Sequence, residues 1–410
     1  MHQGQAAGEP GRNPDIRYLL GCCLQRRWQQ EAVRCPLAAE ATADRAWERL
    51  IALARREGVA PLLYHGTRPP APGLLPDWVL EELHLDYVRT ARKNTLWFTG
   101  LEEALRLLAQ QGVPVILLKG AALAEGLYGN LALRPMADID LLVHERHVPL
   151  ALESLSDLGY RYSGDSNLQP QDVHANQLML RGPEPIAALI EVHWALFWFP
   201  YYQRSVSDEW LWSTARAVRV GDVSALALGP EALLLHLCGH LLHHYGGDGG
   251  PFRLLWIHDV VEFIQRHGCE VDWEMLIEQA RDSDLVLALR QVFDQLADEW
   301  GAPIPAEVLG RLRAQVPAAT EVRARSWLAA TNVSMRRYPM ASLAALPDWR
   351  SKTAYLWNDL LFPSRAFMVR RYAIRHPLLV PLYYPHRWIS GLARELALRR
   401  ATSPPGAPPE

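Results

Sequence analysis

The chain has 410 residues, of which 49% are hydrophobic and 21% charged, and its formal net charge is −3. This is the composition of an ordinary globular protein with room for two or three domains. It excludes the strongly basic character typical of nucleic-acid-binding proteins, so a polynucleotide partner would have to meet a local patch. The five cysteines include no CxxC pair, which argues against a disulfide framework or a zinc knuckle and favours a reducing environment.

The two ends of the chain are predicted to be disordered. Residues 1–14 and 403–410 are rich in Gly, Pro and polar residues. The N-terminus lacks the basic and apolar segments of a signal peptide, and no apolar run approaches the ~20 residues of a membrane-spanning helix. We therefore expect a cytoplasmic protein without a transmembrane segment.

Three regions are predicted between these ends. Residues 15–95 have apolar residues at helical spacing and form a helical N-terminal region, interrupted by a Pro-rich stretch at 67–78. Residues 96–205 form a core with strands. Residues 206–402 return to helical spacing and are predicted to be a helical C-terminal region.

Within the core, strands and helices alternate and then give way to a hairpin. The predicted elements are a strand over 113–119, a helix over 121–129, a strand over 137–143, a helix over 146–159, and hairpin strands over 176–181 and 186–196. Gly182 to Pro185 supplies the hairpin turn. The expected fold is α+β, with a small mixed β-sheet flanked by helices.

Asp138 and Asp140 alternate along one predicted strand, so their side chains share a face. Two carboxylates at such a short distance repel each other unless a cation such as Mg²⁺ or Mn²⁺ lies between them. Glu191 lies on a later strand, with His193 on the same face. Three carboxylates on neighbouring strands could hold two metal ions for in-line displacement at a triphosphate. An isolated Asp-x-Asp more often ends a strand at the surface, so the neighbouring residues decide whether it indicates a metal site.

The first of these neighbours is the turn at Lys119 and Gly120. The turn follows a predicted strand and opens a helix, which directs backbone N–H groups towards a phosphate. Gly120 would allow close approach and Lys119 would supply a point charge. Arg134 could clamp phosphate oxygens with two hydrogen bonds. Each residue alone could equally be a surface residue, but together they favour a nucleotide site.

Residues 119–143, KGAALAEGLYGNLALRPMADIDLLV, resemble the first half of the site of the nucleotidyltransferase superfamily, in particular a poorly characterised bacterial branch. The Lys119-Gly120 turn departs from the usual pattern, in which Gly-Ser or Gly-Gly stands closer to the Asp-x-Asp, so altered phosphate contacts are expected. Further segments that fit this branch are residues 91–120, 190–196, 233–244, 253–264 and 360–373.

The resemblance implies a nucleotidyltransferase-like fold, Mg²⁺ dependence, and transfer of a nucleoside monophosphate from a nucleoside triphosphate with release of pyrophosphate. It makes Asp138 and Asp140 metal ligands. Glu191 becomes the third carboxylate, which could activate the acceptor hydroxyl as a base. The acceptor could be a small molecule, RNA or protein. A non-catalytic nucleotide-binding protein is an alternative.

Histidines gather in the two predicted helices over 230–245 and 252–268. His236 and His240 are spaced i, i+4 and could bind a metal, which with His258 and Asp259 suggests an HD-type metal-dependent phosphohydrolase as an alternative. They could also be packing or surface residues. A third interpretation places His240, Arg253 and Asp259 in the cleft opposite the carboxylates. The predicted nucleotide-binding residues are then Lys119, Gly120, Arg134, His193, His240 and Asp259.

The segment from Arg365 to Arg400 combines basic and aromatic residues, including Arg370, Arg371 and Tyr372. Such a segment could bind an anionic partner such as RNA, lipid or an acidic protein. It could equally be the solvated face of a helix.

Overall fold

The computed structural model describes residues 43–66, 75–163, 176–199, 201–203, 205–245 and 252–333, together with Leu20, Gly21, Leu24 and parts of 343–390. The predicted disorder of residues 1–14 and 403–410 lies outside these residues. Among the described helices, none is long and apolar enough to cross a membrane.

A mixed sheet of seven strands forms the centre of the molecule, in the order β3-β4-β5-β2-β1-β7-β6. The central strand β2 pairs antiparallel with β1 and parallel with β5. This confirms the predicted α+β class with a mixed sheet. The strands are β1 (Ile116–Leu117), β2 (Ile139–Leu142), β3 (Arg161–Tyr162), β4 (Gln177–Arg181), β5 (Leu189–His193), β6 (Arg216–Val220) and β7 (Val223–Ala227).

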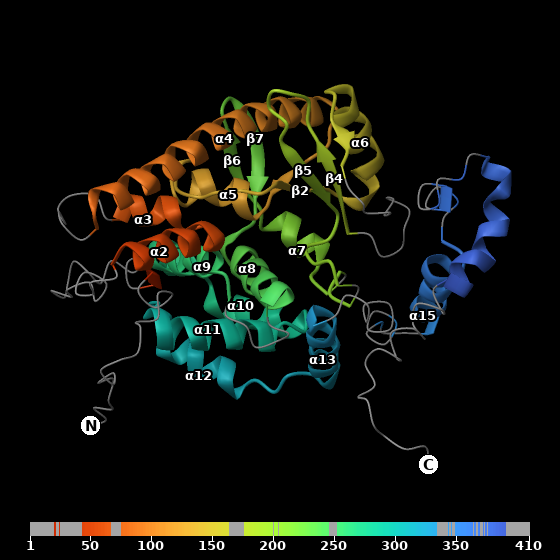
Figure 1. Cartoon of the computed structure of the whole chain (residues 1–410). Helices are drawn as coiled ribbons and strands as arrows, with labels where there is room; N and C mark the ends of the chain where they lie inside the picture. The colour runs from red at the N-terminus through yellow and green to blue at the C-terminus, as the bar shows by residue number, and fades with distance from the viewer. Residues whose placement is uncertain are drawn as a thin grey trace, which may run out of the picture.

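Helices cover the sheet in layers. Figure 1 shows the long helix α4 running along the sheet, with α6 beside it, and a second layer of helices from α8 to α13 below. The helices are α2 (Ala43–Glu57), α3 (Ala60–Gly66), α4 (Asp77–Gln110), α5 (Lys119–Gly126), α6 (Val148–Asp157), α7 (Asp208–Ser213), α8 (Pro230–Tyr245), α9 (Leu254–His267), α10 (Trp273–Asp282), α11 (Val286–Trp300), α12 (Ala306–Ala314), α13 (Ala319–Val333) and α15 (Trp349–Tyr355).

Both faces of the central strands are buried, in two separate cores. Ile139 and Leu141 of β2 pack into the core that β2 shares with α4 and α6, whereas Leu142 and Leu118 pack into the core of the helical layer. Side chains alternate between the two faces of a strand, so Asp140 lies on the face opposite Ile139 and Leu141. The aspartate therefore points towards the helical layer.

The strands β6 and β7 correct one expectation. Residues beyond 206 were predicted to be helical, but residues 216–227 form an antiparallel hairpin that joins the sheet beside β1. Alternating apolar residues flank Gly221, which takes a φ of +53° at the turn, a left-handed conformation that favours glycine. The sheet is therefore larger than the small sheet expected from residues 96–205.

The C-terminal part carries α15, a π-helical segment η6 (Leu356–Leu361) and a 3₁₀ turn η7 (Pro377–Leu379). Met368, Ile374 and Val380 form a small core of their own. Most arginines of the segment from 365 to 400 lie outside the described residues, so its anionic partner stays a prediction.

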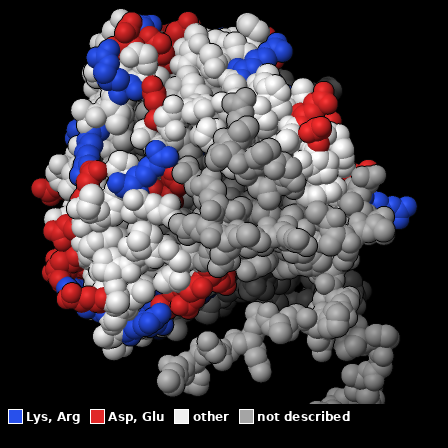
Figure 2. Space-filling view, turned by 90° about the vertical axis from the view of Figure 1, so that its left-hand side faces the viewer, with Lys and Arg blue, Asp and Glu red and all other residues white. Residues whose placement is uncertain are grey.

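Figure 2 shows one face of the molecule, on which Lys and Arg side chains alternate with Asp and Glu. Ion pairs link helices at the surface, as where Arg55 of α2 contacts Glu82 and Asp86 of α4. The coloured residues of this face form no large patch of one sign, which agrees with the nearly neutral net charge.

Candidate active site

Three carboxylates meet where β2 and β5 lie side by side. The two strands are parallel, with Asp140 directly opposite Glu191. Asp140 and Glu191 are buried, and Asp138 is half-buried just before β2 begins. Burial, together with the negative charges of Asp140 and Glu191, raises the pKa of Asp138 to about 6. The three carboxylates that the sequence grouped therefore lie close enough to interact.

Asp140 is held by two cationic groups on one of its oxygens. Lys119 Nζ and His193 Nε2 each lie 2.9 Å from Asp140 Oδ1. Burial favours the protonated acid, but Lys119 and His193 outweigh burial and hold the pKa of Asp140 well below its usual range. Its other oxygen, Oδ2, forms no hydrogen bond with any described residue. Asp140 is therefore a fixed carboxylate with one oxygen open to a ligand.

His193 bridges the two buried carboxylates. Its Nε2 lies 2.9 Å from Asp140 Oδ1 and 3.3 Å from Glu191 Oε2, and Gln177 Nε2 donates to the same Glu191 oxygen at 2.8 Å. Burial lowers the pKa of His193, but the hydrogen bonds to the two carboxylates overcome that effect and raise it.

The other ring nitrogen of His193, Nδ1, indicates whether the histidine is a metal ligand or a residue that orients the two carboxylates. Asp140, Glu191 and His193 offer ligand atoms within 4.8 Å of one another. A histidine that binds a metal through one nitrogen almost always donates its other N–H to an acceptor. His193 Nδ1 has no such partner among the described residues. This favours a histidine that orients two carboxylates over one that ligates a metal.

The turn at Lys119 and Gly120 closes one side of the site. Lys119 begins α5 with a φ of +37°, an uncommon conformation for a residue other than glycine. Burial lowers the pKa of Lys119, but the Asp140 carboxylate outweighs burial and raises it, so the ammonium is charged. A Cβ on Gly120 would lie 2.7 Å from Arg134 Nη1, so only glycine lets this arginine pack against the turn.

Arg134 and Asp259 form a buried ion pair. Arg134 Nε lies 3.0 Å from Asp259 Oδ1, and Nη2 lies 2.7 Å from Oδ2. The Tyr128 hydroxyl donates to Asp259 Oδ1 at 2.8 Å and lies 2.9 Å from His258 Nδ1. Asp259 is thus enclosed behind Arg134, which corrects the expectation that it lines the cleft. The Nη1 group of Arg134, next to Gly120, stays on the side of the cleft.

Helix α4 fixes the segment that leads into β2, a contribution that the sequence analysis missed. Lys93 Nζ donates to the carbonyl of Met136 at 2.8 Å. The fully buried Asn94 donates through Nδ2 to the carbonyls of Leu131 at 2.6 Å and Arg134 at 2.9 Å. A polar residue at helical spacing from buried apolar ones was the available signal.

These residues surround one cavity of about 640 Å³ between the sheet and the helical layer. The carboxylates, Lys119 and Gly120 form its sheet side. His240 and Arg253 line it from the helical layer, as one interpretation of the sequence expected. The remaining lining residues, apart from those already named, are Pro135, Met136, Ala137, Trp198, Leu255 and Trp256.

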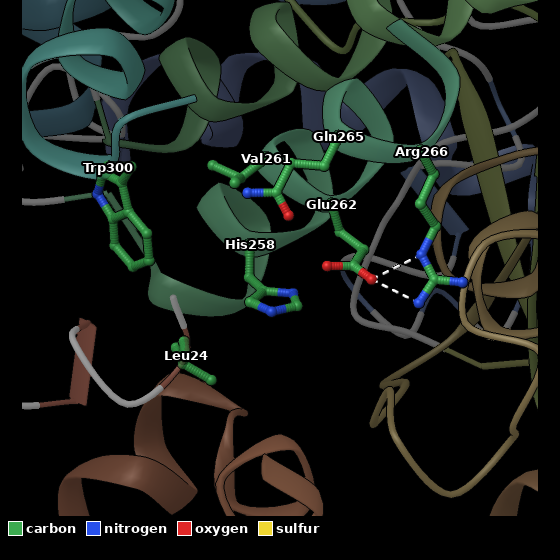
Figure 3. A pocket seen from close by; sticks show the side chains of 7 residues that line it. All are labelled: Leu24, His258, Val261, Glu262, Gln265, Arg266 and Trp300. Atoms are coloured by element: carbon green, nitrogen blue, oxygen red, sulfur yellow. Dashed lines mark hydrogen bonds and ion pairs between the residues drawn. The ribbon is translucent and has the colours of Figure 1, made fainter. Parts of the chain in front are cut away.

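The described residues of the histidine-rich helices do not form the metal site that an HD-type phosphohydrolase requires. Among the described residues, the group with metal-ligand spacing is the one on the sheet, not a group built on His236, His240, His258 and Asp259. Figure 3 shows His258 beside a second cavity along α9, of about 220 Å³, where Glu262 pairs with Arg266 at 2.6 Å. Asp259 already accepts hydrogen bonds from Arg134 and Tyr128.

The mixed sheet is the one expected of a nucleotidyltransferase-like fold. Comparison with protein families agrees, because residues 43–301 match the family described as "Uncharacterised nucleotidyltransferase". The match spans more than half of the chain, so the chain belongs to this family. This confirms the resemblance seen in the sequence.

Other comparisons add little. A search of curated proteins found no match. A crystal structure of an antigenic nucleotidyltransferase-like protein from Paracoccidioides brasiliensis is 16% identical, covering 52% of this chain and 96% of that chain with a TM-score of 0.37.

Proposed function

We propose that this protein transfers a nucleoside monophosphate from a nucleoside triphosphate to an acceptor hydroxyl, with Mg²⁺ or Mn²⁺ as cofactor. The observation that carries this proposal is the pairing of Asp140 with Glu191 on adjacent parallel strands, with Asp138 beside them in one cavity. Membership of a nucleotidyltransferase family supports it. A cytoplasmic location, where thiols stay reduced, belongs to the same proposal.

The donor set fits a hard divalent cation. Asp138, the open Oδ2 of Asp140, and Glu191 supply carboxylate oxygens, which are the ligands that Mg²⁺ and Mn²⁺ prefer. Burial and the negative charges of Asp140 and Glu191 raise the pKa of Asp138, and the positive charges of Lys119 and His193 offset this only in part. When bound, the metal would neutralise charge on the phosphates and align the attacking and leaving oxygens.

The cationic turn would bind the triphosphate. Backbone N–H groups at the start of α5 and Arg134 Nη1 meet beside Gly120, where a phosphate oxygen could accept hydrogen bonds from both. Asp259 holds Arg134 through its other two nitrogens and so fixes the direction of Nη1. Lys119 acts mainly on Asp140, so it is a weaker phosphate contact than the sequence suggested.

We propose Glu191 as the general base. In the proposed reaction the acceptor oxygen bonds to the α-phosphorus, the bond from that phosphorus to the bridging oxygen breaks, and pyrophosphate leaves. The hydroxyl proton passes to the Glu191 carboxylate, which Gln177 and His193 hold in position. No covalent enzyme intermediate is needed.

The size of the cavity bears on the acceptor. Its volume of about 640 Å³ falls within the range of about 300–1,000 Å³ of small-molecule sites. The cavity could hold a nucleotide together with a small acceptor or the end of a larger one. We therefore propose an acceptor that presents a hydroxyl group to this cavity, without assigning its class.

The test is label transfer by a double variant. Asp138→Asn with Asp140→Asn removes two negative charges while keeping side-chain shape, and should lower transfer of α-phosphate label into acceptors from a cell extract about a thousandfold, equivalent to about 4 kcal/mol. Asp157→Asn, at an exposed end of α6, is the matched control. Transfer by the double variant at the wild-type rate would place the chemistry elsewhere. Nucleotide binding without pyrophosphate release by the wild type would favour a non-catalytic protein.

A further inference from the structure

One side of the cavity is aromatic. Trp198 follows β5, His240 lies on α8, and Trp256 lies on α9, and all three line the cavity that the carboxylates also line. We call these three residues the aromatic wall. With Arg253 and Leu255, they give the cavity a group of lining residues without a carboxylate.

The aromatic wall differs from the packing tryptophans of the core. Trp47, Trp97 and Trp300 are buried, whereas Trp198, His240 and Trp256 are each partly exposed. Leaving part of a large aromatic ring open to the cavity forgoes the free energy that its burial would contribute. A bound ligand with a flat apolar surface would recover it.

Contacts within the protein hold two members of the wall, His240 and Trp256. The rings of His240 and Trp256 meet edge-to-face, with centroids 4.4 Å apart. The Arg253 guanidinium lies 5.5 Å from the Trp256 ring centroid, and Arg253 Nε donates to the carbonyl of Glu57 at 3.4 Å. A fixed aromatic surface loses little conformational entropy when a ligand packs on it.

We propose that the aromatic wall binds the nucleobase of the nucleoside triphosphate. This inference rests on the proposed function, which places the triphosphate at the carboxylates and the Gly120 turn. The nucleoside must then extend along the rest of the same cavity, where the aromatic wall offers the flat surface that a base requires. Because ring contacts tolerate every base, the site selects nucleotides by their triphosphate and by the presence of a base, more than by which base it is.

The experiment compares nucleotides with a ligand that has phosphates and no base. Dissociation constants of ATP, GTP, CTP, UTP and inorganic tripolyphosphate are measured calorimetrically in excess Mg²⁺. We expect wild-type protein to bind the four nucleotides within about tenfold of one another, and about 5- to 150-fold more tightly than tripolyphosphate, the range of base–aromatic stacking.

Variants assign that difference to the wall. Trp198→Ala and Trp256→Ala should each weaken nucleotide binding towards that of tripolyphosphate and leave tripolyphosphate binding unchanged. Trp198→Phe and Trp256→Phe, which keep a ring, should restore most of the nucleotide affinity. Trp78→Ala, at an exposed residue of α4, is the control for loss of a tryptophan.

The outcomes separate the inference from the proposed function. Equal wild-type affinity for nucleotides and tripolyphosphate, or alanine variants that keep full nucleotide affinity, would overturn the inference while leaving the phosphate site intact. Alanine variants that bind nucleotides normally but need more acceptor in the transfer assay would assign the wall to the acceptor and overturn it equally. Wild-type protein that binds neither ligand would overturn the proposed function itself.

Discussion

Two carboxylates are almost completely buried, Asp140 on the sheet and Asp259 on α9, and they differ in how their oxygens are paired. Asp140 uses one oxygen for Lys119 and His193 and leaves the other open. Asp259 uses both oxygens for Arg134 and accepts a further hydrogen bond from Tyr128. The comparison teaches that burial and ion pairing alone do not mark a functional carboxylate. A functional carboxylate is marked by an oxygen that is left open towards a cavity.

Removing Asp259 should therefore destabilise the fold. Asp259→Ala leaves Arg134 buried without its partner, which typically costs about 3–5 kcal/mol, and should lower the free energy of unfolding measured by urea denaturation by that amount. Asp222→Ala breaks an exposed pair with Arg219 and should cost less than about 1 kcal/mol.

A paired replacement sharpens this test. Arg134→Met combined with Asp259→Leu removes both charges and should recover most of the lost stability, because no buried charge is left alone. The combined variant should still bind nucleotide poorly, since Arg134 Nη1 is gone. An Asp259→Ala protein as stable as wild type would show that the ion pair does not join the sheet to the helical layer.

Glu321 is a third buried carboxylate, and among the described residues it forms no ion pair. Its Oε1 accepts from the backbone N–H of Leu287 and its Oε2 has no partner among the described residues. Burial raises the pKa of Glu321 to about 7. Between its unfolded pKa and pH 7 the folded protein keeps a proton that the unfolded chain releases, so wild-type stability falls as pH rises through this window.

Glu321→Gln should remove that dependence. The variant should match wild type near pH 4 and exceed its free energy of unfolding by about 3 kcal/mol at pH 8. Urea denaturation across this pH range measures the difference, with Glu153→Gln, at an exposed residue of α6, as control. A constant difference between variant and wild type at all pH values would contradict the raised pKa.

His193 gives the smallest expected effect and tests how Asp140 is oriented. If His193 orients the carboxylates, His193→Ala should weaken Mn²⁺ binding about 10- to 100-fold, as loss of an outer-shell partner does. His193→Gln, whose amide N–H can replace the Nε2 donor, should retain most of the affinity. Binding is read from the electron paramagnetic resonance signal of free Mn²⁺. Equal loss in both variants would instead make His193 a metal ligand.

The parts of the site that depend on local pattern could be predicted from the sequence. Alternation along a strand placed Asp138 near Asp140, and the hairpin signal placed Glu191 on a strand with a free face. These carboxylates meet if their strands are neighbours in the sheet. In the structure β2 and β5 are neighbours, and Asp140 lies opposite Glu191. The short-range spacing of residues was therefore enough to predict the carboxylates of the site.

The rest depends on contacts between distant residues, which periodicity does not encode. Arg134 and Asp259 are 125 positions apart, so neither reveals its partner in the sequence. Asn94 was hidden within a helix because its acceptors lie on a segment about 40 residues later. The hairpin β6–β7 was missed because its short alternating strands were read as part of a helical region.

The most direct test of the central claim needs no acceptor. Mn²⁺ is titrated into the protein in the presence of a nucleoside triphosphate analogue that cannot be cleaved at the α–β bond, and bound Mn²⁺ is measured for wild type, Asp140→Asn and the control Asp157→Asn. If Asp140 with Asp138 and Glu191 forms a metal–nucleotide site, wild type and control will bind Mn²⁺ together with the analogue, and Asp140→Asn will lose both. Undiminished binding of metal and analogue by Asp140→Asn would contradict the account.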